Sequence, residues 1–146
     1  MNAEAFFAEA RKQFGRLSQS QVDGINAILN AAGGRKRSHV AYLLATAWHE
    51  TARTMQPVRE TLAGSDAQAV ARLDRAWKAG KLKQVKVPYW RFDDTGRTWL
   101  GRGYVQLTHK DNYRKAAAMV GVDLLGNPSL ALRADIAAQI LVEGCE

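Results

Sequence analysis

Apolar and polar residues follow helical spacing through the first part of this chain. An amphipathic stretch at 3–14 predicts one helix, and apolar residues at helical spacing between 22 and 29 predict a second. Ser18 and Gln21 match the capping box that begins a helix, and the glycine pair at 33–34 is expected to end it. We therefore expect two short helices here.

A third helix is predicted after Ser38, its expected N-cap, with an apolar stripe over 40–48 that faces the core. Seven residues past Leu43, Glu50 lies at one edge of this stripe, whereas His49 points away from it. A carboxyl at such an edge is a candidate general acid, because desolvation favours its protonated form. Spacing alone favours the plainer alternative, a solvent-facing glutamate near a helix end.

The pattern changes in the middle of the chain. Residues 66–78 predict a helix, which Gly80 is expected to end. Basic and apolar side chains then alternate over 81–90, turn residues occupy 93–96, and 97–100 resume an extended pattern. We predict a small β-hairpin in this region.

Two glycines around an arginine at 101–103 suit a tight bend or a close approach to a ligand, and do not suit a helix. Both glycine-rich nucleotide-binding patterns are missing, so nucleotide binding is rejected. If the backbone is extended, Gln106 and Thr108 share a side, and Asn112 returns beneath Thr108 if Thr108 caps the next helix. Such a cluster can hold a water and sugar hydroxyls, although a helix cap with two surface amides is an equal alternative.

The last part of the chain is also helical. Residues 113–120 predict a helix that Gly121 ends, and Pro128 fits the first position of a final helix whose apolar residues run to 142. A chain of 146 residues, 47% hydrophobic and 24% charged, suits one globular domain with its own core. Its longest apolar-rich stretch is too short to span a bilayer.

The net charge of the chain indicates which classes of partner to expect. The net charge of +7 and pI near 9.9 indicate nucleic acid, bacterial envelope polymers or acidic lipid as possible partners. For the basic run at 35–37, a solvated surface is an equal alternative. Cys145 is the sole cysteine and the histidines, His39, His49 and His109, are scattered, so we expect no internal disulfide, metal site or cofactor.

Two motifs carry a family resemblance. The segment 47–51, Ala-Trp-His-Glu-Thr, and the segment 101–108, with Asn and Tyr at 112–113, resemble blocks of the family 19 glycoside hydrolases, the chitinase-like group. With Asn127-Pro128-x-Leu130 they are especially similar to the bacteriophage endolysins, which cut peptidoglycan glycan strands. The resemblance implies a mainly α (α+β) class, a lysozyme-like helical domain over 1–146 with a small β-hairpin beside the active-site cleft.

By this resemblance the chain is a glycosidase that hydrolyses β-1,4 bonds with inversion. Glu50 is implied as the general acid, and a second carboxylate must activate water on the opposite face of the sugar. Glu60 is our prediction for this base, because a loop after the helix could bring it across the cleft. Its rivals are Asp66, Asp93 and Asp94. The plainer alternative for Glu60 is a surface ion pair with a neighbouring arginine, Arg59 or Arg53.

The resemblance also implies contact residues. Thr108 matches the family residue that positions the attacking water, and Gln106 and Asn112 match its sugar-binding amides. Arg102 is expected to pair with a catalytic carboxylate. We group His49 with the binding residues, and expect its ring to hold the helix end by a hydrogen bond rather than to shuttle protons.

Aromatic residues gather in sequence around the glycine-rich bend, and some are expected to line the cleft, because sugar faces pack on aromatic rings. They are Tyr89, Trp90, Trp99, Tyr104 and Tyr113. We select Trp99, Tyr104 and Tyr113 as substrate contacts.

Peptidoglycan is favoured over chitin by the phage-like pattern at 14–25 and by the basic charge. A chitinase acting on chitin oligomers, a lytic transglycosylase, a catalytically silent wall-binding module and a basic nucleic-acid binder remain alternatives. We expect a monomer that acts on glycan strands within an anionic cell envelope, with no nucleic-acid partner and no stable membrane insertion.

The two ends of the chain add expectations about location and length. The N-terminus lacks a basic n-region, so we expect synthesis in the host cytoplasm without a signal peptide, and action in the periplasm or cell wall after membrane permeabilisation. Endolysins of this group usually continue past 144–146 with another helix. The resemblance therefore implies a missing C-terminal helical segment, in a short natural member, a truncated product or a fragment.

Overall fold

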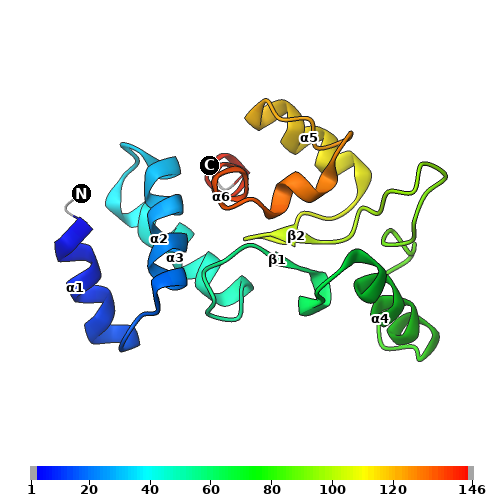
Figure 1. Cartoon of the computed structure of the whole chain (residues 1–146), viewed down its shortest axis with the longest axis horizontal. Coiled ribbons are helices and arrows are strands. Elements are labelled where there is room, and N and C mark those ends of the chain that lie inside the picture. The colour runs from blue at the N-terminus through cyan, green and yellow to red at the C-terminus, as the bar shows by residue number, and fades with distance from the viewer. Residues whose placement is uncertain (1–2, 145–146) are drawn as a thin grey trace.

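The computed structural model describes residues 3–144 and is mainly helical, which confirms the expected α+β class (Figure 1). The α-helices among these residues are α1 (Ala3–Phe14), α2 (Gln19–Ala32), α3 (Arg37–Glu50), α4 (Asp66–Lys78), α5 (Lys110–Val120) and α6 (Ala134–Gly144). Two short 3-10 helices, η1 (Glu60–Leu62) and η2 (Pro128–Leu132), accompany them. Cys145 lies outside the described residues.

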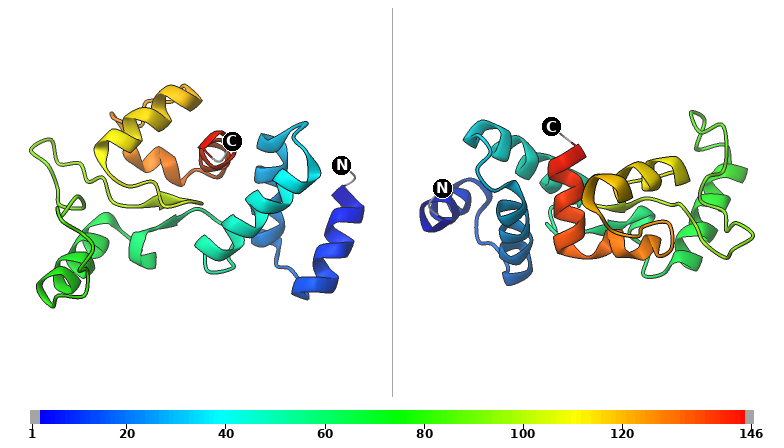
Figure 2. Two further views of the ribbon diagram at one scale, coloured as in Figure 1. Left: turned by 180° about the vertical axis from the view of Figure 1, so that it is seen from behind. Right: turned by 90° about the horizontal axis from the view of Figure 1, so that it is seen from above.

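A two-stranded antiparallel sheet joins distant parts of the chain near the centre of the molecule. Strand β1 (Val58–Arg59) pairs with β2 (Arg102–Gly103), so that Val58 lies opposite Gly103. Helix α1 occupies one end of the long axis and α4 the other, and the views from behind and from above keep this order (Figures 1 and 2). The sheet therefore places the segment after α3 beside the glycine-rich bend.

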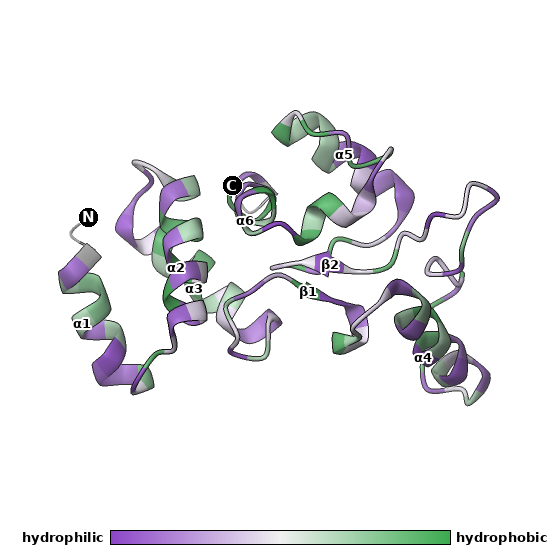
Figure 3. Cartoon of the chain, in the orientation of Figure 1, coloured by the Kyte–Doolittle hydropathy of each residue, from purple (hydrophilic) through white to green (hydrophobic). Residues whose placement is uncertain are grey.

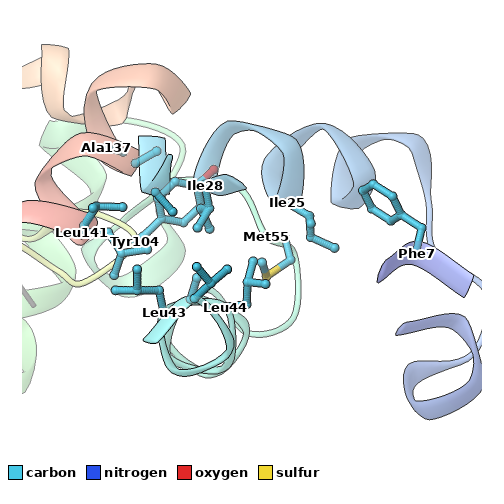
Figure 4. Packing of buried hydrophobic residues seen from close by; sticks show 14 residues of the cluster. Phe7, Ile25, Ile28, Leu43, Leu44, Met55, Tyr104, Ala137 and Leu141 are labelled. Atoms are coloured by element: carbon cyan, nitrogen blue, oxygen red, sulfur yellow. The ribbon is translucent and has the colours of Figure 1, made fainter. Parts of the chain in front are cut away.

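The largest core cluster lies where α2, α3 and α6 meet the turn after β2. Ile28, Leu43, Tyr104 and Leu141 are fully buried there, and Phe7 adds a contact from α1 (Figure 4). Burying large apolar side chains of this kind contributes roughly 1.5–3 kcal/mol each. This cluster fixes the C-terminal half of α3 against the rest of the chain.

Two smaller clusters complete the interior. One, around Tyr113, lies between α5 and α6, and the other, around Trp90, lies under α4. Figure 3 shows the corresponding mixture of hydrophobic and hydrophilic positions along each helix. Within residues 3–144, no helix combines the length and apolar character that crossing a membrane requires.

The loop after α3 is docked closely on α2. A Cβ atom on Gly24 would lie only 1.7 Å from the carbonyl oxygen of Met55, so only glycine permits this approach. The side-chain amide of Gln21 donates to the Arg53 carbonyl at 2.8 Å, and that of Gln56 donates to the Ser20 carbonyl at 2.6 Å. The backbone immediately after Glu50 is thus held from two sides.

Most predicted helix ends are confirmed, but not every predicted start. The capping box of Ser18 and Gln21 begins α2, and Gly121 ends α5 in a left-handed conformation. Helix α3, however, begins at Arg37 with no side-chain cap, so Ser38 is already inside it. The expected final helix is divided, because η2 starts at Pro128 and extended backbone at Arg133 separates it from α6.

The β-hairpin predicted between 81 and 100 is wrong, although its turn exists. The carboxylate of Asp93 accepts hydrogen bonds from the backbone N–H groups of Thr95 and Arg97, but no strand forms within 79–101. Leu82 and Val85 pack against the Trp90 cluster instead of alternating across a sheet. Burial of these apolar side chains outweighed the alternating pattern.

Candidate active site

Glu50 is the last residue of α3, and its side chain is exposed. Its carboxylate has no hydrogen-bond or ion-pair partner among residues 3–144. The structure shows the solvent-facing glutamate that spacing alone favoured, and not the carboxyl desolvated at an apolar edge, because the stripe faces the core while the helix end projects into solvent. The ring of His49 is exposed too, and within the same part of the chain it makes none of the hydrogen bonds expected to hold the helix end.

Thr51 does what we expected of His49. It is fully buried, and its hydroxyl donates to the carbonyl of Ala47 at 2.7 Å and accepts from the backbone N–H of Met55 at 3.0 Å. These two bonds fix the chain on both sides of the turn after Glu50. A threonine just past a helix end is a signal for such side-chain bonding to backbone, which the sequence analysis missed.

Glu60 is held firmly at the start of η1, directly after β1. Its Oε1 accepts from the backbone N–H of Gly101 at 2.8 Å, and its Oε2 accepts from the hydroxyl of Tyr89 at 2.7 Å. Its own backbone N–H donates to the Gly101 carbonyl at 2.7 Å. Both carboxylate oxygens act as acceptors, which is the role of an ionised carboxylate. The alternative of a surface ion pair with Arg59 or Arg53 does not occur.

Tyr89 joins Glu60 to the second motif. Burial, followed by the hydrogen bond to Glu60, raises the pKa of the Tyr89 hydroxyl above its usual range, so the phenol remains a donor. Its ring packs on the ring of His109 with 4.2 Å between centroids. A ring nitrogen of His109 lies 3.0 Å from the Thr108 hydroxyl. Contacts therefore run from Glu60 through the rings of Tyr89 and His109 to Thr108. Neither ring was predicted from the sequence to make this link.

Asp66, a rival for the base, is occupied by two arginines. Its oxygens accept from Arg59 Nε and from Arg102 Nη2, each at 2.8 Å. Arg102 is 1% exposed and also donates to the Thr98 carbonyl and the Tyr113 hydroxyl. Arg102, expected to pair with a catalytic carboxylate, thus pairs with a rival for the base and with neither Glu50 nor Glu60. Its place as a substrate contact is wrong, because the side chain is buried in the interior.

The other two rivals lie in the turn at 93–96. Asp93 binds Thr95, Arg97 and the indole of Trp99, and these hydrogen bonds, led by the Thr95 hydroxyl, lower the pKa of Asp93 to about 2. Asp94 is exposed on the same turn. Among the four carboxylates considered for the base, Glu60 alone forms hydrogen bonds with the backbone of the glycine-rich segment, at Gly101.

Gln106 is turned toward the protein. Its φ is +51°, so the expected extended backbone is wrong at this position. Its amide nitrogen donates to the carbonyls of Val58 and Gly103, at 3.0 and 3.2 Å. A Cβ on Gly101 would lie 2.7 Å from the Gln106 amide oxygen and 3.3 Å from Glu60 Oε1. The absence of a side chain at Gly101 therefore lets both oxygens lie close to the Gly101 backbone.

The predicted pairing of Thr108 with Asn112 is confirmed, but the predicted cap is wrong. The amide of Asn112 donates to the Thr108 carbonyl at 2.9 Å across the start of α5. His109, with φ of +72°, is the N-cap residue and makes no side-chain cap bond. Thr108 and Asn112 thus lie together as predicted, while Gln106 turns back toward β1.

The aromatic residues selected as substrate contacts are buried. Tyr104 and Tyr113 have no exposed surface and Trp99 is 6% exposed, so none can pack on a sugar ring. Burial raises the pKa of Tyr104 and of Tyr113 to about 12. These three assignments are wrong, because the residues around the bend are apolar anchors of two core clusters.

Backbone strain marks the same place without reference to any motif. Every positive-φ residue other than glycine within 3–144 lies either in 52–62 or in 106–109: Ala52, Arg53, Met55, Thr61, Leu62, Gln106 and His109. Such conformations cost of order 1–3 kcal/mol each and gather at functional sites. The first segment begins two residues after Glu50 and contains Glu60, and the second contains Thr108, so backbone strain gathers around the candidate site residues.

Comparison with known families identifies the family of the chain. A family model described as chitinase class I matches residues 24–140, a span that includes both glutamates and the segment from Gly101 to Asn112. No solved structure matches the chain. Because the match covers most of the sequence, the chain belongs to the class I chitinase family, glycoside hydrolase family 19, and is a glycosidase.

Proposed function

We propose that the protein is an endolysin-type hydrolase that cleaves β-1,4 bonds in the glycan strands of peptidoglycan. The observation that carries the proposal is the contrast between two glutamates. Glu60 is fixed by two donors to its carboxylate, at 2.7 and 2.8 Å, whereas Glu50 is exposed at a helix end with no donor beside it among the described residues. Different environments suit a fixed base and a mobile acid.

The proposed reaction is a single displacement with inversion. Glu50 gives its proton to the glycosidic oxygen as the bond to the anomeric carbon breaks. A water attacks that carbon from the opposite face, and Glu60 accepts the proton that the water releases. The Thr108 hydroxyl, linked to Glu60 through His109 and Tyr89, is proposed to position this water.

Peptidoglycan is proposed over chitin because the protein carries a net charge of +7, and bacterial envelopes are anionic whereas chitin is neutral. We propose that the protein reaches its substrate in the periplasm or cell wall after the membrane has been permeabilised. Chitin oligomers, which present similar β-1,4-linked sugars, are the second substrate to test.

The test compares wild type, Glu50→Gln and Glu60→Gln on purified peptidoglycan and on chitin oligosaccharides. Each substitution should lower the rate by at least about a hundredfold. Glu9→Gln, an exposed change on α1, is the matched control and should retain full activity. Near wild-type activity of Glu60→Gln would remove Glu60 from the mechanism.

Product analysis separates the remaining alternatives. Mass spectrometry should find saccharides with reducing ends, and NMR during digestion should find the α-anomer first, as inversion of a β-bond requires. Products with only 1,6-anhydro ends would identify a lytic transglycosylase instead. Binding to peptidoglycan without any cleavage would identify a silent wall-binding module.

A further inference from the structure

Positive charge is concentrated in one segment of the chain. Residues 67–92 contain seven cations and one anion, Asp74, a net charge of +6. The whole chain has a net charge of +7, so the remaining residues together carry +1. This segment comprises α4 after its first residue, Asp66, and the loop that follows, at the end of the molecule opposite α1 (Figure 1). We call residues 67–92 the basic lobe.

Helix α4 presents its cations away from its buried face. Arg72, Arg75 and Lys78 recur every three residues, so they lie within about 120° around the helix axis. All three are exposed, whereas Ala69 and Leu73 are buried in the Trp90 cluster. The helix therefore has an apolar side against the protein and a cationic side in solvent.

The loop after α4 continues this cationic surface in a defined conformation. Lys81, Lys83 and Lys86 are exposed, and between them Leu82 and Val85 pack against the Trp90 cluster. A turn closes when the backbone N–H of Val85 donates to the Leu82 carbonyl at 3.1 Å. The lysines are thus presented by an anchored loop.

Few carboxylates neutralise the basic lobe. Asp74 pairs with Arg91 at 3.2 Å and also accepts from the Trp90 indole at 2.7 Å; these contacts, led by the Trp90 hydrogen bond, lower its pKa. The other six cations have no carboxylate within 4.0 Å among the described residues. Of the three flanking acids, Asp66 is bound to Arg102, Asp93 is bound within the turn, and Asp94 is exposed beside it. Uncompensated charge of one sign attracts an anionic partner.

The basic lobe adjoins the candidate active site. Tyr89, in its loop, donates to Oε2 of Glu60 at 2.7 Å. A polymer whose glycan strand occupies the site would therefore have groups near this loop. In peptidoglycan, the groups that branch from the strand are peptides with free carboxylates.

We propose that the basic lobe binds the carboxylates of the peptide branches of peptidoglycan next to the strand being cut. The identity of this partner rests on the proposed function, whereas the location of the surface rests on the charge distribution. Chitin has no such branches, so the basic lobe would favour the branched, anionic polymer over the neutral one.

Binding can be tested without cleavage by placing every variant in a Glu50→Gln background and sedimenting the protein with purified sacculi. The triple variant Lys81→Gln, Lys83→Gln, Lys86→Gln should bind at least about fivefold more weakly. The matched control, Arg11→Gln, Lys12→Gln, Arg16→Gln, removes as much charge at the opposite end and should bind like the parent. Circular dichroism should show that both fold.

A second set of binding measurements changes the sacculi instead of the protein. Conversion of the carboxylates of the sacculi to neutral amides should weaken binding of the parent as strongly as the triple lysine substitution weakens binding to native sacculi. The triple variant should bind amidated sacculi little more weakly than it binds native ones. Equal binding of native and amidated sacculi would overturn the proposal. So would equal loss in the control variant, which would indicate attraction by total charge.

Two further probes identify other partners. Tighter binding of a random-sequence DNA duplex than of native sacculi at equal salt would overturn the proposal in favour of nucleic acid. Tighter binding of vesicles of anionic phospholipid would do so in favour of a membrane surface. Because these are binding measurements, a failure of the catalytic proposal would show separately, as unchanged hydrolysis by Glu50→Gln and Glu60→Gln.

Discussion

The hydroxyl of Tyr89 donates a hydrogen bond of 2.7 Å to Oε2 of Glu60, across 29 positions of the chain. Because Oε1 of Glu60 is bound to the Gly101 N–H, this bond leaves the carboxylate little freedom to rotate. A base that must meet a water on one face of a sugar gains from such restriction. If Glu60 is the base proposed above, Tyr89 is a positioning residue for it.

Tyr89→Phe removes this donor and keeps the ring that packs on His109. We expect kcat to fall by roughly tenfold, the effect of losing one hydrogen bond to a charged group. KM should change much less than kcat, because the lost hydrogen bond orients Glu60 and does not hold substrate. Steady-state kinetics that separate kcat from KM check this.

Tyr42→Phe is the control, since Tyr42 is 59% exposed on α3. It should leave both kcat and KM unchanged. If Tyr89→Phe lowers only the thermal midpoint and leaves kcat where it was, Tyr89 supports the fold and does not position Glu60.

Gly101→Ala tests the close packing around Glu60. The new Cβ would lie 2.7 Å from the Gln106 amide oxygen and 3.3 Å from Glu60 Oε1, so at least one of these groups must move. We expect kcat to fall by about a hundredfold, with a much smaller effect on substrate binding, because a displaced catalytic group costs this much. Steady-state kinetics on purified peptidoglycan measure both quantities.

Gly34→Ala is the matched control, because a Cβ there meets no atom within 4 Å. This variant should keep wild-type kinetics. Equal activity of Gly101→Ala and Gly34→Ala would show that the positions of Gln106 and Glu60 near Gly101 have no part in catalysis.

Helix positions could be predicted from sequence because local signals determine them. The capping box at Ser18 and the left-handed Gly121 depend on residues within one turn. The hairpin prediction was wrong because β1 finds its partner β2 more than forty positions away, and alternation within 81–90 carries no information about that pairing. Strand partners depend on tertiary contacts that a local pattern does not contain.

Site residues that a motif names could be proposed from sequence, whereas their surroundings, which packing decides, could not. Glu60 was proposed from the need for a second carboxylate, and its contacts differ from those of Asp66 and Asp93. Tyr104 was wrongly selected, because an aromatic residue beside a glycine-rich bend serves equally as a core anchor. Exposure separates these roles, and it is a property of the whole fold.

Asp66→Asn tests whether Asp66 stabilises the fold or takes part in catalysis. The change leaves the guanidinium of Arg102, 1% exposed, without its carboxylate partner. We expect the free energy of unfolding to fall by about 3 kcal/mol, because a buried charge is left uncompensated. Urea denaturation measures this cost, and activity per folded molecule should remain within about threefold of wild type if Glu60 is the base.

Asp135→Asn is the control for this change, since the pair of Asp135 with Arg133 is largely exposed. It should cost less than about 1 kcal/mol. A double variant, Asp66→Asn with Arg102→Met, should regain part of the lost stability because the stranded charge is gone. If Asp66→Asn abolished activity in fully folded protein, Asp66 would displace Glu60 as the predicted base.

The turn at Asp93 should make stability depend on acid pH. Hydrogen bonds from Thr95, Arg97 and Trp99 lower the pKa of Asp93 to about 2 from its ordinary value of 3.8. The folded pKa is thus the lower one, so the contribution of Asp93 is complete above pH 3.8 and is lost as the pH falls through about 2. In Asp93→Asn this dependence should vanish, and the difference in thermal midpoint between wild type and variant should shrink steadily from pH 5 to pH 2, a range that spans carboxylate titration. A constant difference over that range would mean that the ionised form of Asp93 is not the form the turn stabilises.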